Sequence, residues 1–129
     1  MSVRVEIVTP SRVAWKGDAD QIEAPGLLGE FGVLADHAAM LAATRAGVVT
    51  VHQGGQSTRM VVGPGFAEVA SNEVTLLVDI CEDGADVDKA QAAQDLASAE
   101  NILGAASPDS REFQEASSKA ALAAARLDL

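Results

Sequence analysis

The segment Ala24–Leu41, APGLLGEFGVLADHAAML, is the most informative stretch of this chain. Glycines recur at every third position from Gly26 to Gly32, and Glu30 is the only charged residue among them. Each glycine would cost a helix roughly 1 kcal/mol relative to alanine, so this spacing argues against a helix. It favours a strand edge or a tight loop in which the backbone comes close to another group. We expect the segment to hold Glu30 and His37 in fixed positions.

Composition limits the classes of protein to which the chain can belong. Its 129 residues suffice for one domain, or for one small domain with an appendage, and 48% of them are hydrophobic. The net charge of −10 argues against binding to nucleic acid or to anionic lipid, since both require a basic face. The sequence shows no signal peptide, transit peptide or membrane-spanning stretch. We therefore expect a soluble chain on the cytoplasmic side, without direct membrane insertion.

Alternating apolar residues in the first two thirds of the chain predict strands with one buried face. Val3, Val5 and Ile7 alternate with other side chains, and a similar pattern covers residues 74–80. Turn signals follow at intervals of about eight to twelve residues. They are Lys16-Gly17-Asp18, Gly54-Gly55, Gly63-Pro64-Gly65 and Ser71-Asn72. This spacing predicts a β-sandwich or barrel over residues 1–84, with one irregular or helical turn within 37–44.

The last part of the chain, residues 85–129, is rich in alanine and predicts an antiparallel two-helix hairpin. Asp86 is the expected N-cap of a first helix, Val87–Leu103, and Gly104 its end. Ser107 and Pro108 are expected to start the second helix. The apolar stripes comprise Ala92, Leu96, Ala99 and Leu103, then Phe113, Ala116, Ala120, Ala123 and Leu127. Alanine buries little area, so we expect the hairpin to rest on the sandwich or on a partner.

No motif of catalytic or cofactor chemistry is found in the sequence. It has no phosphate-binding loop, no dinucleotide fingerprint and no nucleophile elbow. The two histidines, His37 and His52, lack the spacing of a metal site. The carboxylate pairs Glu23 with Glu30 and Glu68 with Glu73 are explained more simply as exposed strand or turn residues. Cys81 ends an apolar run and is expected to be a buried, inert thiol. We predict a protein that is not an enzyme and holds no metal or cofactor.

The segment Gly29–Leu41 resembles the signature of the epsilon subunit of F-type ATP synthases. In that family a strand ends in a pattern like G-E-(F/L)-G-(V/I/L)-L-x-x-H-x-x-(M/L)-L, which matches Gly29–Leu34, His37, Met40 and Leu41. Further segments that resemble the family follow in its order: Ile7–Pro10, Gly47–Val51, Gly65–Val69 and Val74–Leu77. The resemblance covers nearly the whole chain.

The resemblance implies a mainly β N-terminal sandwich or barrel of about ten strands, followed by a C-terminal helical hairpin. It also implies a non-catalytic rotor subunit, clamped to the gamma subunit and seated on the ring of c subunits, which transmits torque. On this basis Glu30 is expected to face the c ring, and His37, Met40 and Leu41 to lie at the contact with gamma. The complex would place the chain at the cytoplasmic face of a bacterial inner membrane.

The predicted hairpin departs from a motif of the family. Some members bind ATP through a pattern like (I/L)-D-x-x-R-A, and here Asp88 and Ala92 match while neutral Gln91 replaces the arginine. A planar cation suited to phosphate contact is therefore lost, which weakens the expectation of ATP binding.

The charge of the hairpin bears on inhibition of ATP hydrolysis. Some bacterial members inhibit by extending basic helices towards acidic segments of the catalytic alpha and beta subunits. Residues 88–129 hold seven acidic and four basic residues, so we predict weak or absent inhibition. Two alternatives remain: a regulatory module that senses ATP through the hairpin, and a small hydrolase with a site around Glu30 and His37.

Overall fold

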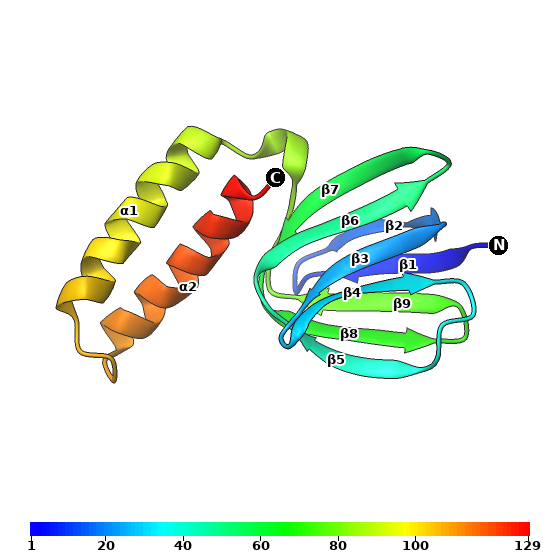
Figure 1. The fold of residues 1–129 in the computed structure, drawn as a ribbon, viewed down its shortest axis with the longest axis horizontal. Helices are drawn as coiled ribbons and strands as arrows, with labels where there is room; N and C mark the ends of the chain where they lie inside the picture. Colours follow the sequence, from blue (N-terminus) through cyan, green and yellow to red (C-terminus); the bar gives the residue numbers. More distant parts are fainter.

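The alternating segments form ten strands of one strongly curved sheet in the computed structural model, which describes residues 1–129 (Figure 1). The strands are β1 Val3–Val8, β2 Val13–Ala19, β3 Gln21–Gly26, β4 Gly29–Leu34, β5 Met40–Thr44, β6 Gly47–Gln53, β7 Gln56–Val62, β8 Gly65–Ala70, β9 Glu73–Val78 and β10 Cys81–Asp83. Their order in the sheet is β10-β7-β6-β3-β5-β8-β9-β1-β2, and β4 pairs with β3 beside this path.

The sheet folds over on itself into a nearly closed sandwich. All strand pairs are antiparallel except β1 with β9, which is parallel. The chain passes from β2 to β3 at Asp20, whose N–H donates to the His52 carbonyl at 2.8 Å and ties this corner to β6. The predicted mainly β sandwich or barrel with a C-terminal hairpin is therefore confirmed.

The core lies between the two layers and follows the predicted alternation. Val3, Val5 and Ile7 of β1 are fully buried and belong to one core cluster of 17 residues, in which Val5 and Ile7 lie beside Val74 and Leu76 of the neighbouring β9. Cys81 is also buried, as expected, and its burial raises the pKa of the thiol.

Two of the expected turns are confirmed as tight hairpins. Gly54 and Gly55 join β6 to β7 with φ of 53° and 85°, and Ser71 and Asn72 join β8 to β9 with φ of 46° and 63°. Such positive angles match the twist of the flanking strands.

Of two other expectations in this part of the chain, one is wrong and one is only partly right. Lys16-Gly17-Asp18 is no turn but lies within β2, where a Cβ on Gly17 would come within 3.0 Å of the Trp15 ring. The glycine there makes room for an indole. Of the irregular or helical turn predicted within residues 37–44, residues 37–39 are irregular, but Met40–Thr44 form the strand β5 because they pair with β8. Tertiary pairing has overridden the local preference of alanine and methionine for helix.

The helices are α1, Lys89–Ala105, and α2, Arg111–Leu127, preceded by a 3₁₀ turn at Gly84–Asp86. Asp88, not Asp86, caps α1 by accepting from the Gln91 N–H. Gly104 lies inside α1 and does not end it.

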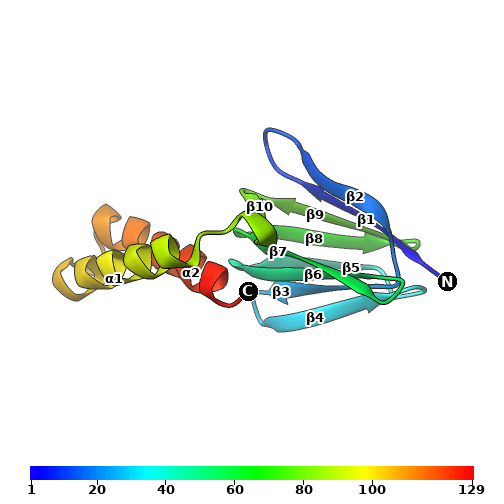
Figure 2. The same cartoon turned by 90° about the horizontal axis from the view of Figure 1, so that it is seen from above.

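The start of the second helix is also later than predicted. Ser107 and Pro108 form a turn, and Ser110 is the N-cap of α2. The hairpin projects from one end of the sandwich, and the C-terminal part of α2 packs against β6 and β7 (Figures 1 and 2).

Candidate functional site

Glu30 lies on β4, next to the tight turn that joins this strand to β3. A Cβ on Gly26 would come within 2.4 Å of the Gly29 carbonyl, which shows the close backbone approach expected of this segment. The turn itself exposes Leu27 and Leu28, and the latter side chain is fully exposed. Glu30 is exposed, faces Pro25 across the hairpin and forms no ion pair. The turn therefore presents an acidic and an apolar group together at the end of the sandwich near α2.

His37 lies at the opposite end of the sandwich, in the connection between β4 and β5 (Figure 1). The Asp36 N–H donates to Asn72 Oδ1 at 2.5 Å, which fastens this loop to the turn between β8 and β9. The His37 ring is partly buried, and its Nδ1 lies 2.7 Å from the Ala38 carbonyl oxygen. The structure thus places His37 in a loop fastened by hydrogen bonds and Glu30 on an exposed strand without a side-chain partner, and it does not bring them together.

Met40 and Leu41 point to opposite faces of β5. Met40 lies opposite Val69 and packs against the core cluster. Leu41 lies opposite Glu68 and is exposed. Of the two apolar residues proposed for a contact, only Leu41 therefore offers its side chain to a partner without rearrangement.

An apolar row crosses the outer face of five neighbouring strands, and sequence reasoning did not identify it. Strand register places its members side by side: Ala43, Phe66, Leu77, Val8 and Val13 on β5, β8, β9, β1 and β2. Phe66 is 56% exposed and Leu77 51% exposed. The signal for this row is the run Leu76-Leu77-Val78, where an apolar residue occupies a position that alternation assigns to solvent.

The hairpin is fastened to the sandwich by an ion pair between distant parts of the chain. Arg126 of α2 donates from Nε and Nη2 to the two carboxylate oxygens of Glu82 on β10, at 2.8 and 2.7 Å. Arg126 Nη1 also lies 3.9 Å from Asp95 of α1. The hydrogen bond to Glu82, followed by its charge, raises the pKa of Arg126. One guanidinium thus joins both helices to the sheet.

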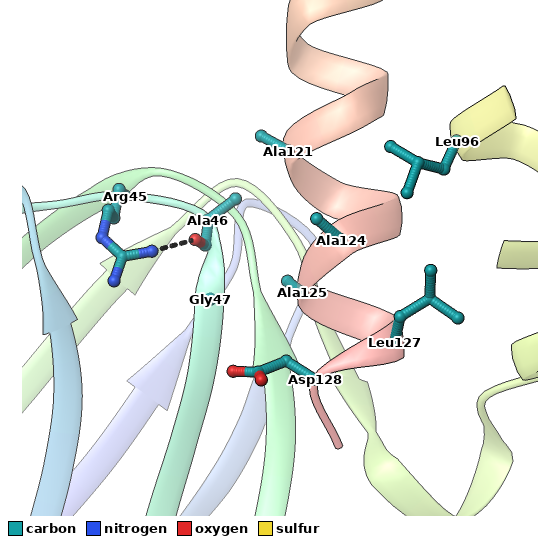
Figure 3. Close-up of a pocket in the computed structure, with 9 residues that line it drawn as sticks. All are labelled: Arg45, Ala46, Gly47, Leu96, Ala121, Ala124, Ala125, Leu127 and Asp128. Carbon is teal, nitrogen blue, oxygen red and sulfur yellow. Dashed lines mark hydrogen bonds between the residues drawn. The ribbon is translucent and has the colours of Figure 1, made fainter. Parts of the chain in front are cut away.

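Packing between the hairpin and the sandwich is incomplete. A cleft of about 570 Å³ lies between α2, Leu96 of α1 and the start of β6. Figure 3 shows Ala121 and Ala125 facing Ala46 and Gly47 across it. Alanine side chains are too short to fill this space, so the hairpin rests on a narrow contact.

The residues that match the ATP-binding pattern make contacts within the chain in this structure. Asp88 caps α1, the Gln91 side-chain amide donates to Asp95 at 2.9 Å, and Ala92 is buried. Four carboxylates and two arginines line the neighbouring cleft: Glu82, Asp83, Asp86, Asp88, Arg12 and Arg126. This excess of negative charge is unfavourable to a polyphosphate.

A second polar cluster links β3, β6 and β7. His52 Nε2 lies 3.1 Å from Glu23 Oε1, and its Nδ1 lies 2.9 Å from Ser57 Oγ. From the sequence we considered Glu23 with Glu30 and His52 with His37. Glu23 and His52 were not linked because only the register of β3 and β6 brings them together. These contacts fasten three neighbouring strands.

Two further findings concern membranes and metals. Neither helix is long and apolar enough to cross a membrane. No group of three or more histidine, cysteine or acidic side chains is arranged to hold a metal ion.

Comparison with known proteins gives consistent results. Residues 2–84 match the family model described as the ATP synthase delta/epsilon chain β-sandwich domain. The ATP synthase epsilon chain of Rhodopseudomonas palustris strain BisA53 is 42% identical over 98 residues, which are 76% of this chain and 73% of the relative. That of Gloeothece citriformis is 40% identical over 83% of this chain and 78% of its own.

Solved structures show the same fold at low sequence identity. A chain of the Euglena gracilis mitochondrial ATP synthase, in a structure of its OSCP, F1 and c-ring, superposes with a TM-score of 0.86 at 19% identity. The match covers 95% of this chain and 78% of that one. A chain from the central stalk and c-ring of the Tetrahymena thermophila enzyme gives a TM-score of 0.57 at 17% identity, over 67% of this chain and 70% of that one.

Proposed function

This chain belongs to the delta/epsilon family of ATP synthase subunits and is a non-catalytic epsilon subunit. From this we propose that it acts in the rotor, where it joins the gamma subunit to the c ring. In this role it transmits rotation between proton flow and ATP synthesis and catalyses no step itself. The complex attaches it peripherally to the cytoplasmic face of a bacterial inner membrane. We further propose that residues 1–84 and 85–129 behave as two domains, because α2 touches only a small part of the sheet.

The observation that supports the gamma contact best is the apolar row. Phe66, Leu77 and Val13 are largely exposed on one continuous sheet face, and Leu41 lies on the same face. Contiguous exposed apolar surface on a soluble chain typically marks a protein interface. Gamma therefore docks along this face, with Leu41 at its margin and His37 in the loop at the far end of the sandwich.

We assign the c-ring contact to the start of β4, at the end of the sandwich opposite His37. There Glu30 and the exposed Leu27-Leu28 turn combine a negative charge with apolar contact area. Polar loops of the ring would meet this end while gamma occupies the sheet face, so both partners are bound at once.

Substitution on the sheet face tests the gamma contact. Phe66→Glu should reduce co-purification of gamma at least tenfold, because a carboxylate would be buried without a partner. Leu34→Glu is the matched control, since Leu34 is also 56% exposed but lies on β4. Equal retention of gamma by both variants would contradict the assignment of the gamma contact to this sheet face.

Crosslinking tests the ends of the molecule. A cysteine at Glu30 should crosslink to c subunits and one at His37 to gamma, whereas one at Glu112 of α2 should reach neither. The native Cys81 is buried and gives little background. Crosslinks from the cysteine at position 30 to gamma alone would contradict the assignment of this end of the sandwich to the c ring.

The hairpin is proposed to inhibit ATP hydrolysis weakly or not at all, and not to sense ATP. Its excess of acidic residues is unfavourable to contact with acidic segments of the alpha and beta subunits, and Asp88 and Gln91 are engaged within α1. Removal of residues 85–129 should change hydrolysis by the assembled complex less than about twofold. A several-fold rise would show inhibition, and millimolar or tighter ATP binding by calorimetry would favour the sensor.

A further inference from the structure

A second cleft lies between the end of the sandwich and the middle of α2, and it shares Leu27 with the turn assigned to the c ring. Its volume is about 450 Å³, within the range of small-molecule sites. Leu27, Ala46 and Ile80 from the sandwich and Ala121 and Leu122 from α2 supply apolar walls. The cleft is therefore a partly open site of ligand size, with apolar walls and a polar rim, at the junction of sheet and hairpin.

Thr44, at the end of β5, is a polar group in this lining that lacks a partner. The residue is only 5% exposed, and its Oγ1 is the one buried side-chain nitrogen or oxygen of the chain without a hydrogen bond. Buried hydroxyls are nearly always hydrogen-bonded, so an unpaired one calls for an explanation. A polar group of a bound molecule would supply the missing bond.

The charged residues of the cleft favour an anion. Arg45 and Lys119 both line it, and neither forms an ion pair with a carboxylate of the chain. The Arg45 side chain donates only to the Ala46 carbonyl oxygen, at 3.3 Å. Asp79 is the single acidic residue of the lining, and its carboxylate lies over the Gly63 backbone. Two cations against one carboxylate give the lining a net positive charge, whereas the whole chain has a net charge of −10.

We propose that this cleft binds a small amphipathic carboxylate, with an unbranched alkyl chain along the apolar walls. The carboxylate accepts a hydrogen bond from the Thr44 hydroxyl and is attracted by Arg45 and Lys119. Because the cleft is walled by both the sheet and α2, a bound molecule contacts both and stabilises the docked hairpin. This inference does not depend on the rotor assignment and can be tested on the isolated full-length chain.

Nuclear magnetic resonance titration with decanoate tests the proposal. Amide shifts should concentrate around Leu27, Ile80 and Leu122, and hydrogen exchange in α2 should slow at saturation. Decyltrimethylammonium, with the same chain and the opposite charge, should bind at least tenfold more weakly. No binding of decanoate up to its solubility limit, equal binding of the cation, or shifts elsewhere would overturn the site.

Variants locate the groups that recognise the carboxylate. Lys119→Glu should weaken decanoate binding at least tenfold, whereas Arg111→Glu, an exposed cation of the same helix outside the lining, should leave it unchanged. Thr44→Val removes the hydroxyl at nearly constant size and should weaken binding several-fold, and Asp79→Asn should strengthen it. Equal affinities in all four variants would show that an apolar chain alone is being bound, and would refute the anion site.

Discussion

Replacement of Arg126 by methionine should loosen the hairpin without unfolding the sandwich. The guanidinium makes two hydrogen bonds to Glu82, and the side chains of the pair are only 22% and 29% exposed. An exposed pair is worth at most about 1 kcal/mol, and removal of one partner of a fully buried pair costs about 3–5 kcal/mol. The intermediate exposure puts Arg126→Met at about 2 kcal/mol, since methionine keeps much of the apolar stem and leaves Glu82 access to water.

This loss corresponds to about a thirtyfold larger fraction of undocked hairpin. Native-state hydrogen exchange measures it directly, because amides of α2 should exchange about thirtyfold faster while those of β8 and β9 keep their rates. Arg111→Met is the control, since Arg111 forms no ion pair. In a double-mutant cycle, Glu82→Gln should cost much less once Arg126 is absent. Unchanged exchange in α2, or equal acceleration in the core strands, would refute the idea that this pair holds the hairpin.

Three further predictions concern single residues. Asp88→Ala removes the N-cap of α1 and should lower the free energy of unfolding by about 1 kcal/mol in urea titrations, whereas Asp86→Ala should have little effect. Gly104→Ala should raise stability by up to about 1 kcal/mol in the same titrations, because Gly104 lies inside α1 with open space at its Cβ position; a loss would show hidden strain. Burial raises the pKa of Cys81 above 9.0, so folding favours the protonated thiol. Stability from this residue should fall as pH rises past 9.0, and iodoacetamide at that pH should modify the folded chain far more slowly than the denatured one; equal rates would contradict burial.

The sequence predicted those features that depend on neighbours in the chain. The strand β1, the Gly54-Gly55 hairpin and the two helices follow from periods of two and of three to four residues, and from turn chemistry. The helix starts were misplaced because Asp86, Asp88, Ser107 and Ser110 are all good caps, and only the backbone path selects among them.

Features that depend on register or on distant contacts were not predicted. Arg126 and Glu82 meet only because α2 folds back onto β10, and no local pattern pairs them. The apolar row requires the relative register of five strands. Glu30 and His37 seemed neighbours in sequence, but β4 is extended and places them at opposite ends of the sandwich.

The parallel pairing of β1 with β9 has a consequence for synthesis of the chain. Arg4 lies beside Glu73, so the first strand to leave the ribosome lacks one neighbour until nearly all of the sheet has been made. Such a non-local pairing makes closure slow compared with formation of the hairpin helices. A chain interrupted before Glu73 would expose the free edge of β1, an open template for association with other chains. The first strand of the chain is thus among the last to have both of its edges paired. Incomplete chains are therefore the species most prone to aggregate.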